Sequence, residues 1–187
     1  TWAWPDQGHV VSRLLVLGGT SFVGRAVVAA AQGRGLDVTT LNRGASNPDM
    51  TGVRALRADR NVSVQVRAAL GNEHFDEVID VSGLAPVQVR ATAEIVKSPH
   101  YTLVSTVSTY SDAAYELQAG DLISEDSPTV AGDPDDGAIA DMAHYGSQKR
   151  GCELAALRAF GAEATLIARP GLILGPHENV HRIPYWL

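Results

Sequence analysis

Short apolar runs alternate with segments of helical periodicity along most of the chain. Residues 13–17 form an apolar run that ends at two glycines, a pattern typical of a strand buried on both faces. From Phe22 to Gly33 the apolar positions recur at helical spacing. Further apolar runs predict strands at 38–41, 53–56, 77–81, 101–106 and 165–168, and the segments between them predict helices at about 62–70, 86–96 and 145–160.

Strands that alternate with helices pack as a parallel sheet with right-handed crossover connections. We therefore predict an α/β fold, a Rossmann-like doubly wound parallel sheet. The length of 187 residues suits a single domain. We assign this domain to residues 13–187 and interpret residues 1–12 as an N-terminal extension or tag. Residues 111–144 hold nine Asp or Glu and no Lys or Arg, which indicates a long acidic loop within the domain.

Composition and charge narrow the class of protein. Hydrophobic residues make up 45% of the chain and charged residues 19%, which excludes a disordered or coiled-coil architecture. The net charge of −6 weighs against a nucleic-acid surface, which needs basic residues to neutralise phosphates. No apolar run approaches the roughly 20 residues that span a bilayer, and a single cysteine, Cys152, gives no sign of an oxidising compartment. We expect a cytoplasmic protein without a nucleic-acid or membrane partner.

A glycine-rich turn joins the first predicted strand to the first predicted helix. Its sequence is Gly-Gly-Thr-Ser-Phe-Val-Gly over residues 18–24. At this place in a dinucleotide-binding fold the pyrophosphate lies against the helix N-terminus, where free amides and the helix dipole favour an anion. Serine replaces one of the usual glycines, and the alternative is a turn that only connects strand and helix. The predicted cofactor-binding residues of the turn are Gly18, Thr20, Ser21, Phe22, Val23 and Gly24.

The end of the second predicted strand indicates which dinucleotide the site prefers. NAD-binding sites place a carboxylate here to accept a hydrogen bond from the ribose. This chain has Asn42 and Arg43 instead, and a guanidinium can pair with a 2′-phosphate. We therefore predict NADP(H) as the preferred cofactor, with NAD(H) as the alternative. The competing interpretation is that Arg43 is a solvated surface charge.

Tyr145 and Lys149 stand four residues apart in a predicted helix, so their side chains share one helix face. A nearby ammonium favours the phenolate form of a tyrosine, which lets the phenol exchange a proton with a substrate hydroxyl or carbonyl. Taken alone, such a pair is more often an ordinary surface contact. Its combination with the other motifs favours a catalytic role.

Five motifs together resemble the extended short-chain dehydrogenase/reductase superfamily. They are the turn at 18–24, Val-Ser-Thr-Val-Ser-Thr-Tyr at 104–110, Glu-Asp-Ser-Pro at 125–128, Tyr145-x-x-x-Lys149 and Arg-Pro-Gly-Leu-Ile-Leu-Gly-Pro at 169–176. More narrowly, the chain is similar to bacterial NAD-dependent epimerase/dehydratase-type reductases from about Leu14 to its last residue. The serine in the turn and the Leu-Asn-Arg-Gly segment at 41–44 resemble an atypical branch of the superfamily.

The resemblance implies roles for the residues at matching positions. Tyr145 would donate or accept the proton, and Lys149 would support it electrostatically and bind the nicotinamide ribose. Thr106, rather than the adjacent Ser105, would polarise the substrate oxygen, and Asp59 would lie near the adenine. The residues implied to line the cofactor are Val81, Ser82 and Gly83, and those implied to flank the nicotinamide are Pro170, Gly171 and Leu172.

The resemblance also implies an activity and partners. It implies an oxidoreductase or an epimerase/dehydratase that transfers hydride on a hydroxyl or carbonyl substrate, with a nucleotide-sugar as the generic choice. The helices at 86–96 and 145–160 match those that pair in family homodimers. Family members carry a further C-terminal segment that supplies most of the substrate pocket, and we expect that segment to be missing here. The chain would then be chiefly the nucleotide-binding half of its parent protein.

Two other functions compete with this one. His-Glu-Asn-Val-His at 177–181 fits the HExxH pattern of zinc metalloproteases, but Pro176 and Pro184 leave too short a helix for it, so we predict no metal site. A non-catalytic NADP(H)-sensing or RNA-associated protein on the same fold is the other alternative. The complete Thr-Tyr-Lys set favours catalysis, and the acidic net charge weighs against RNA.

Overall fold

One parallel sheet of six strands organises the part of the chain that the structure, a computed structural model, describes: residues 11–115 and 122–178. The strands run in the order β3-β2-β1-β4-β5-β6, and every neighbouring pair is parallel. This is the order of a Rossmann-like doubly wound sheet, so the predicted fold class is confirmed. The strands are β1 (Arg13–Leu17), β2 (Asp37–Asn42), β3 (Arg54–Arg57), β4 (Glu77–Asp80), β5 (His100–Val104) and β6 (Thr165–Ala168).

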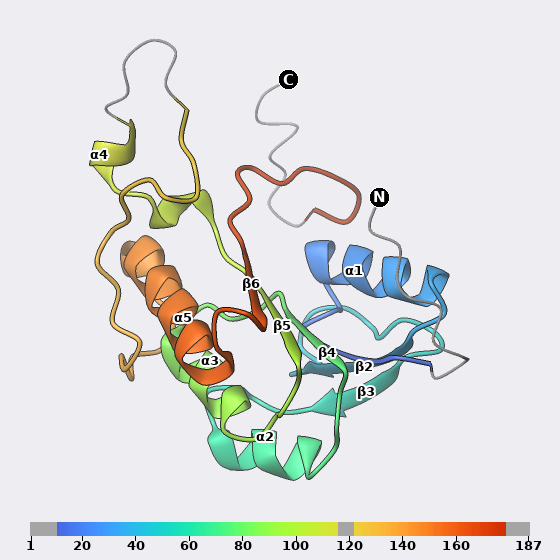
Figure 1. The fold of residues 1–187 in the computed structure, drawn as a ribbon. Coiled ribbons are helices and arrows are strands. Elements are labelled where there is room, and N and C mark those ends of the chain that lie inside the picture. Colours follow the sequence, from blue (N-terminus) through green and yellow to red (C-terminus); the bar gives the residue numbers. More distant parts are fainter. Residues whose placement is uncertain (1–10, 116–121, 179–187) are drawn as a thin grey trace.

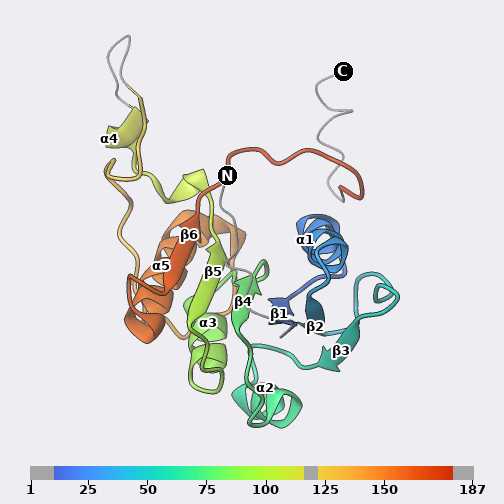
Figure 2. The same cartoon turned by 45° about the vertical axis from the view of Figure 1, so that its right-hand side comes forward.

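Helices lie on both faces of the sheet (Figure 1, Figure 2). One face carries α1 (Phe22–Gly33), and the opposite face carries α2 (Ser63–Leu70), α3 (Pro86–Ala93) and α5 (Tyr145–Phe160). None of the helices among the described residues has both the length and the apolar character that crossing a bilayer requires.

The core consists of two hydrophobic clusters, one on each side of the sheet. Successive residues of a strand point to opposite faces. Leu14 and Val16 of β1 therefore pack in the cluster that holds Val28 of α1, whereas Leu15 and Leu17 belong to the larger cluster formed with α2, α3 and α5. Both faces of β1 are buried, which is the environment that its unbroken apolar run predicts.

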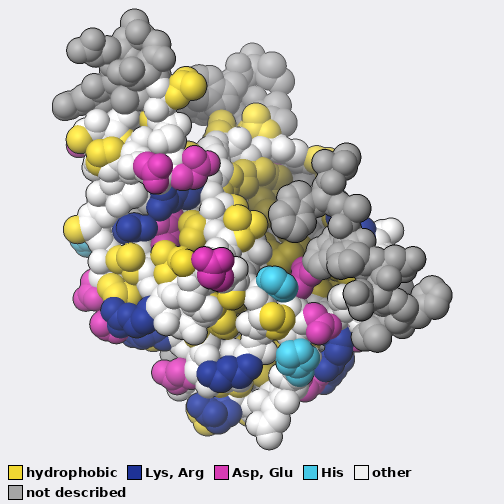
Figure 3. Space-filling view, in the orientation of Figure 1, with side chains coloured by type: hydrophobic (Ala, Val, Ile, Leu, Met, Phe, Trp, Pro, Cys, Tyr) yellow, Lys and Arg dark blue, Asp and Glu magenta, His cyan; other side chains and the backbone are white. Residues whose placement is uncertain are grey.

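The face of the sheet that carries α1 is covered only in part. This helix packs against β1 and β2. On β6, Ile167 packs against the larger cluster, so its neighbour Leu166 points to the other face, where it is 62% exposed. Figure 3 shows hydrophobic side chains recessed between β6 and α1 on this side of the molecule.

The order of the strands reverses at β1, which has β2 on one side and β4 on the other. Leu17 pairs in register with Leu41 of β2 and with Asp80 of β4. The segments that follow these strands therefore leave the sheet at the same edge. In doubly wound folds, ligands bind at the carboxyl ends of the strands beside such a switch point. The topology thus places the glycine-rich turn where a ligand site is expected.

Some boundaries differ from the prediction. The strand expected at 101–106 ends at Val104, because Thr106 caps the short 3₁₀ helix η1 (Val107–Thr109) by accepting a hydrogen bond from the Ser108 backbone nitrogen. The α-helix expected at 86–96 ends at Ala93. The acidic loop expected at 111–144 contains the short α4 (Asp112–Tyr115) and η2 (Met142–His144), and its residues 116–121 lie outside the described residues.

Two arginines from helices elsewhere in the chain contact the acidic loop. Arg158 of α5 donates from Nη1 to both carboxylate oxygens of Asp135, at 2.8 and 2.9 Å. Arg90 of α3 donates to the backbone carbonyl oxygens of Pro134 and Asp136. The loop is therefore held against α3 and α5 on the side of these helices that faces away from the sheet (Figure 1).

Candidate functional site

The glycine-rich turn lets α1 begin very close to the end of β1. A Cβ on Gly24 would lie 2.6 Å from the backbone nitrogen of Gly19, so a side chain there would force the turn to move. Gly18 has a φ of +111°, and a Cβ there would lie 2.6 Å from Cγ2 of Val81. Two of the predicted glycines are thus required by the geometry of the turn itself.

The start of α1 has the features of an anion site. Its first backbone amides have no acceptor within the helix, and the helix dipole favours negative charge there. Phe22 opens the helix with a φ of +31°, a conformation that costs a non-glycine residue about 1–3 kcal/mol. Ser21, which replaces the usual glycine, contacts Asn47 Nδ2 through its Oγ at 3.2 Å, and the same amide donates to the Thr20 carbonyl at 3.0 Å. The loop after β2 is therefore tied to the turn.

A cavity of about 530 Å³ opens at this edge of the sheet. It is lined by the turn and by the segments that follow β2, β3 and β4. Gly83 does not line it, and a Cβ at this position would lie 2.8 Å from Oδ2 of Asp80. The predicted cofactor-binding residues that line this cavity are Gly18, Thr20, Ser21, Phe22, Val23, Gly24, Asn42, Arg43, Asp59, Val81 and Ser82.

Asn42 and Arg43 have different surroundings at the end of β2. Asn42 donates from Nδ2 to Asp49 Oδ1 at 3.2 Å and accepts from the Gly44 backbone nitrogen at 2.8 Å. The guanidinium of Arg57 pairs with Asp49 and holds the pKa of that carboxyl below its usual value. Arg43, by contrast, is exposed, lines the cavity and forms no hydrogen bond or ion pair within the described part of the chain. Its guanidinium is therefore available to an anionic ligand.

A second cavity, of about 440 Å³, adjoins the first. Four residues line both cavities: Phe22, Val23, Val81 and Leu84. The second cavity lies between the start of α5 and the segments that follow β5 and β6. The predicted catalytic and nicotinamide-flanking residues that line it are Thr106, Tyr145, Lys149, Pro170, Gly171 and Leu172.

Lys149 extends from α5 to the ends of two strands. Its Nζ donates to the carbonyl oxygens of Gly83 and Val104, both at 2.7 Å, and the residue is only 2% exposed. Burial lowers the pKa of the Lys149 ammonium, although the charge of Asp80 acts in the opposite direction. An ammonium has three donors, and the third has no acceptor among the described residues, so a ligand in the cavity could take it. The carbonyl of Gly83 thus contributes by anchoring Lys149.

Tyr145 and Thr106 are brought together by a close approach of α5 to η1. Gly146 permits this approach, because a Cβ there would collide with the carbonyl oxygen of Ser108. Ser108 in turn donates its backbone N–H to Thr106 Oγ1 at 3.1 Å. The Tyr145 hydroxyl has no hydrogen-bond partner among the described residues, and the residue lines the second cavity. Both hydroxyl groups therefore border the same space.

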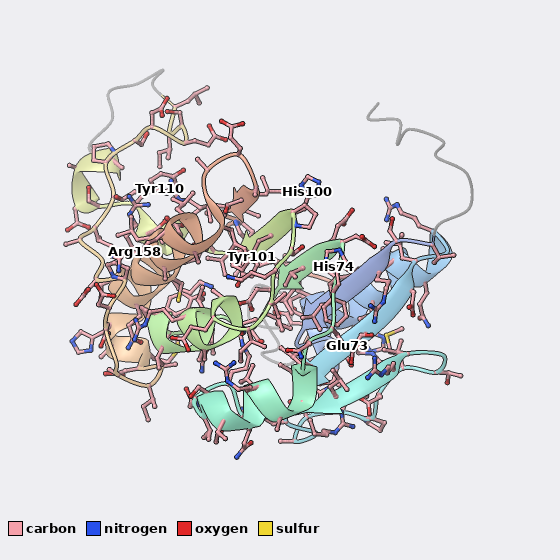
Figure 4. The ribbon with its side chains drawn as sticks, turned by 60° about the horizontal axis from the view of Figure 1, so that its bottom comes forward. Glu73, His74, His100, Tyr101, Tyr110 and Arg158 are labelled. Carbon is pink, nitrogen blue, oxygen red and sulfur yellow. The ribbon has the colours of Figure 1, made fainter. Side chains whose placement is uncertain are left out.

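Sequence reasoning missed a buried ion pair beside the first cavity. Arg60, which follows the predicted Asp59 and also lines the cavity, donates to both carboxylate oxygens of Asp80 at 2.8 and 2.6 Å. The hydroxyl of Tyr101, in the interior of the molecule (Figure 4), donates to Asp80 at 2.7 Å. Burial raises the pKa of Asp80, but Arg60 and Tyr101 outweigh it and hold the pKa below its usual value. The only sign of this ion pair in the sequence is the carboxylate of Asp80, which stands in an apolar strand.

The HExxH segment does not begin a helix in its described part. His177 lies in a turn with a φ of +66°, and Glu178 follows outside any helix. The second histidine, His181, lies outside the described residues. Within the ranges that the structure describes, no three His, Cys, Asp or Glu side chains are grouped so that they could hold a metal ion.

A doubly wound sheet with a glycine-rich turn at its switch point defines a protein of the Rossmann class. The chain belongs to the NAD dependent epimerase/dehydratase family, whose family model matches residues 14–187. The predicted resemblance to epimerase/dehydratase proteins is therefore confirmed. No curated protein sequence matches the chain.

Several solved structures share this fold. The UDP-glucose 4-epimerase of Thermus thermophilus, solved with NAD, is 22% identical with a TM-score of 0.69, over 90% of this chain and 58% of that one. WbmG of Bordetella bronchiseptica, solved with NAD and UDP, is 14% identical with a TM-score of 0.69, over 94% and 58% of the two chains. The dTDP-glucose 4,6-dehydratase of Bacillus anthracis, solved with NAD, is 12% identical with a TM-score of 0.66, over 90% and 57%. This chain therefore spans less than two thirds of the length of the structures it matches.

Proposed function

We propose that the chain binds a nicotinamide dinucleotide and carries the acid–base residues of an NAD(P)-dependent epimerase/dehydratase. The observation that carries this proposal is the adjacency of two cavities, one lined by the glycine-rich turn and the other by Thr106, Tyr145 and Lys149. Because the chain spans about 60% of its solved relatives, the activity proposed is that of the whole protein.

The residues of both cavities suit such a dinucleotide. The free amides at the start of α1 would hold the pyrophosphate. The adenosine end would extend toward Arg43 and Asp59 in the first cavity, and the nicotinamide end would extend past Val81 toward Pro170 and Leu172 in the second. When bound, the dinucleotide supplies a hydride acceptor or donor.

The chain's own residues would provide the proton transfer. Tyr145 would give a proton to, or take one from, a substrate oxygen at its hydroxyl. Thr106, whose Oγ1 donates to Ser108 Oγ at 3.2 Å, would turn this donor to the same oxygen. Lys149 would place a buried positive charge beside the phenol and use its third donor on the ribose. The three residues could act on one substrate, because Thr106, Tyr145 and Lys149 line the same cavity.

We infer a nucleotide-sugar as the substrate class. The support comes from the solved relatives, which include a UDP-glucose 4-epimerase, a dTDP-glucose 4,6-dehydratase and a complex with UDP. A substrate of this kind offers a sugar hydroxyl or carbonyl to the acid–base residues. A non-catalytic sensor would need no acid–base side chain. The Tyr145 hydroxyl, which has no hydrogen-bond partner among the described residues, therefore favours an enzyme over a sensor.

Two observations bear on the form of the dinucleotide. The solved relatives are complexes with NAD, which supports NAD(H). The free Arg43 at the edge of the first cavity supports the predicted preference for NADP(H), because its guanidinium can pair with a 2′-phosphate. The preference for NADP(H) stays a prediction, with a direct test in the titration below.

The test is a fluorescence titration of the purified chain with NADH and with NADPH, repeated for Tyr145→Phe. We expect saturable binding of at least one nucleotide and an unchanged Kd in the variant, because the phenol hydroxyl serves proton transfer rather than binding. In the whole protein, the same variant should lose turnover. Absence of saturable binding with both nucleotides would contradict the proposal. Loss of binding in Tyr145→Phe would assign the residue a structural role instead.

A further inference from the structure

Glu153 is a fully buried carboxylate that holds two other segments of the molecule, those after β5 and β6, to α5. It is 0% exposed. Its Oε1 accepts hydrogen bonds from Ser105 Oγ at 2.6 Å and from Arg169 Nε at 2.9 Å. Its Oε2 accepts from Arg169 Nη2 and from Arg150 Nη1, both at 2.8 Å. Both carboxylate oxygens are thus fully engaged, and no resemblance or motif assigned this residue a role.

The partners of Glu153 stand next to the residues of the second cavity. Ser105 directly precedes Thr106, and Arg169 directly precedes Pro170. The two segments are also joined by backbone hydrogen bonds, from Ser105 to Ala168 at 2.6 Å and from Val107 to Pro170 at 3.1 Å. One carboxylate therefore connects the catalytic helix to both segments that face it across the cavity.

Glu153 lies one helical turn after Lys149 and two turns after Tyr145 on α5. It is therefore rigidly connected to both through the helix. A change in the Glu153 contacts would alter the position of Thr106 and of residues 170–172 relative to Tyr145. It would leave the glycine-rich turn in place, because none of the Glu153 partners belongs to residues 18–24.

The charged partners of Glu153 hold its carboxylate in one position. Burial raises the pKa of Glu153, but the hydrogen bonds from Arg169, Ser105 and Arg150 outweigh it and hold the pKa below its usual value. Arg169 is fixed from its other side as well, because its guanidinium lies 5.0 Å from the centre of the Tyr110 ring and donates to the Glu125 carbonyl at 3.2 Å. A buried carboxylate with bidentate arginine pairing has little freedom to rearrange.

We propose that Glu153 is a positioning residue for the nicotinamide half of the site. It holds Ser105 and Arg169 so that Thr106 and residues 170–172 face Tyr145 and Lys149 at the distance the dinucleotide requires. This inference rests on the proposed function, since it presupposes that the second cavity takes the nicotinamide.

The test compares two ligands that differ only in the nicotinamide half. The first is the reduced dinucleotide that the wild-type chain binds more tightly, NADH or NADPH. The second is the matching fragment without nicotinamide, ADP-ribose or 2′-phospho-ADP-ribose. For each variant we would measure both dissociation constants and compare their ratio with that of the wild type. Global destabilisation does not change this ratio for the folded chain, whereas a displaced nicotinamide pocket does.

Three variants make the test specific. Glu153→Gln removes the charge at nearly constant shape, and Arg169→Lys keeps the charge but removes the bidentate pairing, so it decides the question if the first variant does not fold. The matched control is Glu73→Gln, because Glu73 also pairs with two arginines, Arg13 and Arg54. Figure 4 shows Glu73 on the opposite side of the molecule from Tyr110, on whose ring Arg169 rests.

We expect Glu153→Gln to weaken binding of the reduced dinucleotide on the order of tenfold, or about 1.4 kcal/mol, with little change for the fragment. Arg169→Lys should act in the same direction, and Glu73→Gln should leave the ratio at its wild-type value. An unchanged ratio in both Glu153→Gln and Arg169→Lys, with a wild type that binds the dinucleotide, would overturn the positioning role alone. A wild type that binds neither ligand would overturn the proposed function and this inference with it.

Discussion

The Nζ of Lys149 lies 2.7 Å from the carbonyl oxygen of Gly83, although the two residues are 66 positions apart in the chain. This contact joins the start of α5 to the segment after β4, and the companion contact to Val104 joins it to the end of β5. Lys149 therefore has a structural role in addition to the proposed catalytic one. The two roles can be separated by measuring stability and ligand binding in the same variants.

Replacement of Lys149 by methionine tests the structural role. The substitution leaves two buried carbonyl oxygens without their donor, so we expect the free energy of unfolding at pH 7 to fall by about 1–3 kcal/mol. Because burial lowers the pKa of Lys149 below its ordinary 10.5, the unfolded chain binds this proton more tightly than the folded chain. The wild type should therefore gain stability relative to Lys149→Met as the pH rises toward 10.5.

Urea denaturation of both proteins at pH 7 and pH 10 measures this difference. The exposed Lys97→Met is the control and should follow the wild type at both pH values. A stability difference between wild type and Lys149→Met that stays constant with pH would contradict the assignment of a depressed pKa.

Gly24 and Gly33 provide a matched pair within α1. A Cβ at Gly24 would lie 2.6 Å from the Gly19 backbone nitrogen, whereas a Cβ at Gly33 would meet no atom within 4 Å. Gly24→Ala should therefore displace the turn and weaken dinucleotide binding about tenfold or more. Gly33→Ala should leave binding unchanged and raise the free energy of unfolding by about 0.5 kcal/mol, because it lowers the entropy of the unfolded chain. Equal affinities in the two variants, by fluorescence titration, would place the pyrophosphate elsewhere.

Replacement of Arg43 tests whether this residue distinguishes NADPH from NADH. Its guanidinium lines the first cavity without a partner in the described part of the chain, so a 2′-phosphate is the group it would pair with. We expect Arg43→Ala to weaken NADPH binding on the order of tenfold and to leave NADH binding nearly unchanged. Arg67→Ala, which removes an exposed arginine of α2, is the control for the change in net charge. Equal losses for both nucleotides would show that Arg43 does not read the 2′ position.

The buried pair of Asp80 and Arg60 predicts a specific response to acid. Burial raises the pKa of Asp80, but Arg60 and Tyr101 hold it below the ordinary 3.8. The stabilisation by the pair is therefore fully present above about pH 3.8 and is lost as the pH falls through the lower pKa of the folded chain. Asp80→Asn should lower the free energy of unfolding by about 3–5 kcal/mol at pH 7, because it leaves a buried guanidinium without its counter-ion.

The same variant should lose less stability than the wild type when the pH falls below 3.8, because the group that titrates has been removed. Thermal unfolding of both proteins across this range measures the two slopes. Asp135→Asn breaks an exposed ion pair with Arg158 and should behave like the wild type. Parallel acid slopes in wild type and Asp80→Asn would assign the acid sensitivity to other carboxylates.

The features that the sequence by itself determined are those set by residues close together in the chain. The apolar runs predicted the six strands, and the helical periodicity between them predicted a parallel sheet. These patterns are visible because a parallel strand is buried on both faces and is therefore apolar at nearly every position. The spacing of Gly18 and Gly24 predicted the tight turn. The spacing of Tyr145 and Lys149 predicted that their side chains share one helix face. Both predictions depend only on backbone geometry over a few residues. Helix and strand ends were less well defined, because caps such as that of Thr106 compete with continuation of the strand.

Only the tertiary structure decided which distant side chains meet. Glu153 and Ser105 are 48 positions apart, and Arg60 and Asp80 are 20 apart, so no local spacing relates them. Asp80, Glu153 and Lys149 carry charged groups whose burial costs free energy unless they are hydrogen-bonded. Each has such a partner because β4 and α5 pack against neighbouring elements that carry it. The order of the strands determines these partners, since it is the sheet that places the ends of β1, β4, β5 and β6 along one edge. The chemistry of the site is therefore readable in the residue types, but its geometry depends on contacts that form only when the whole sheet has assembled.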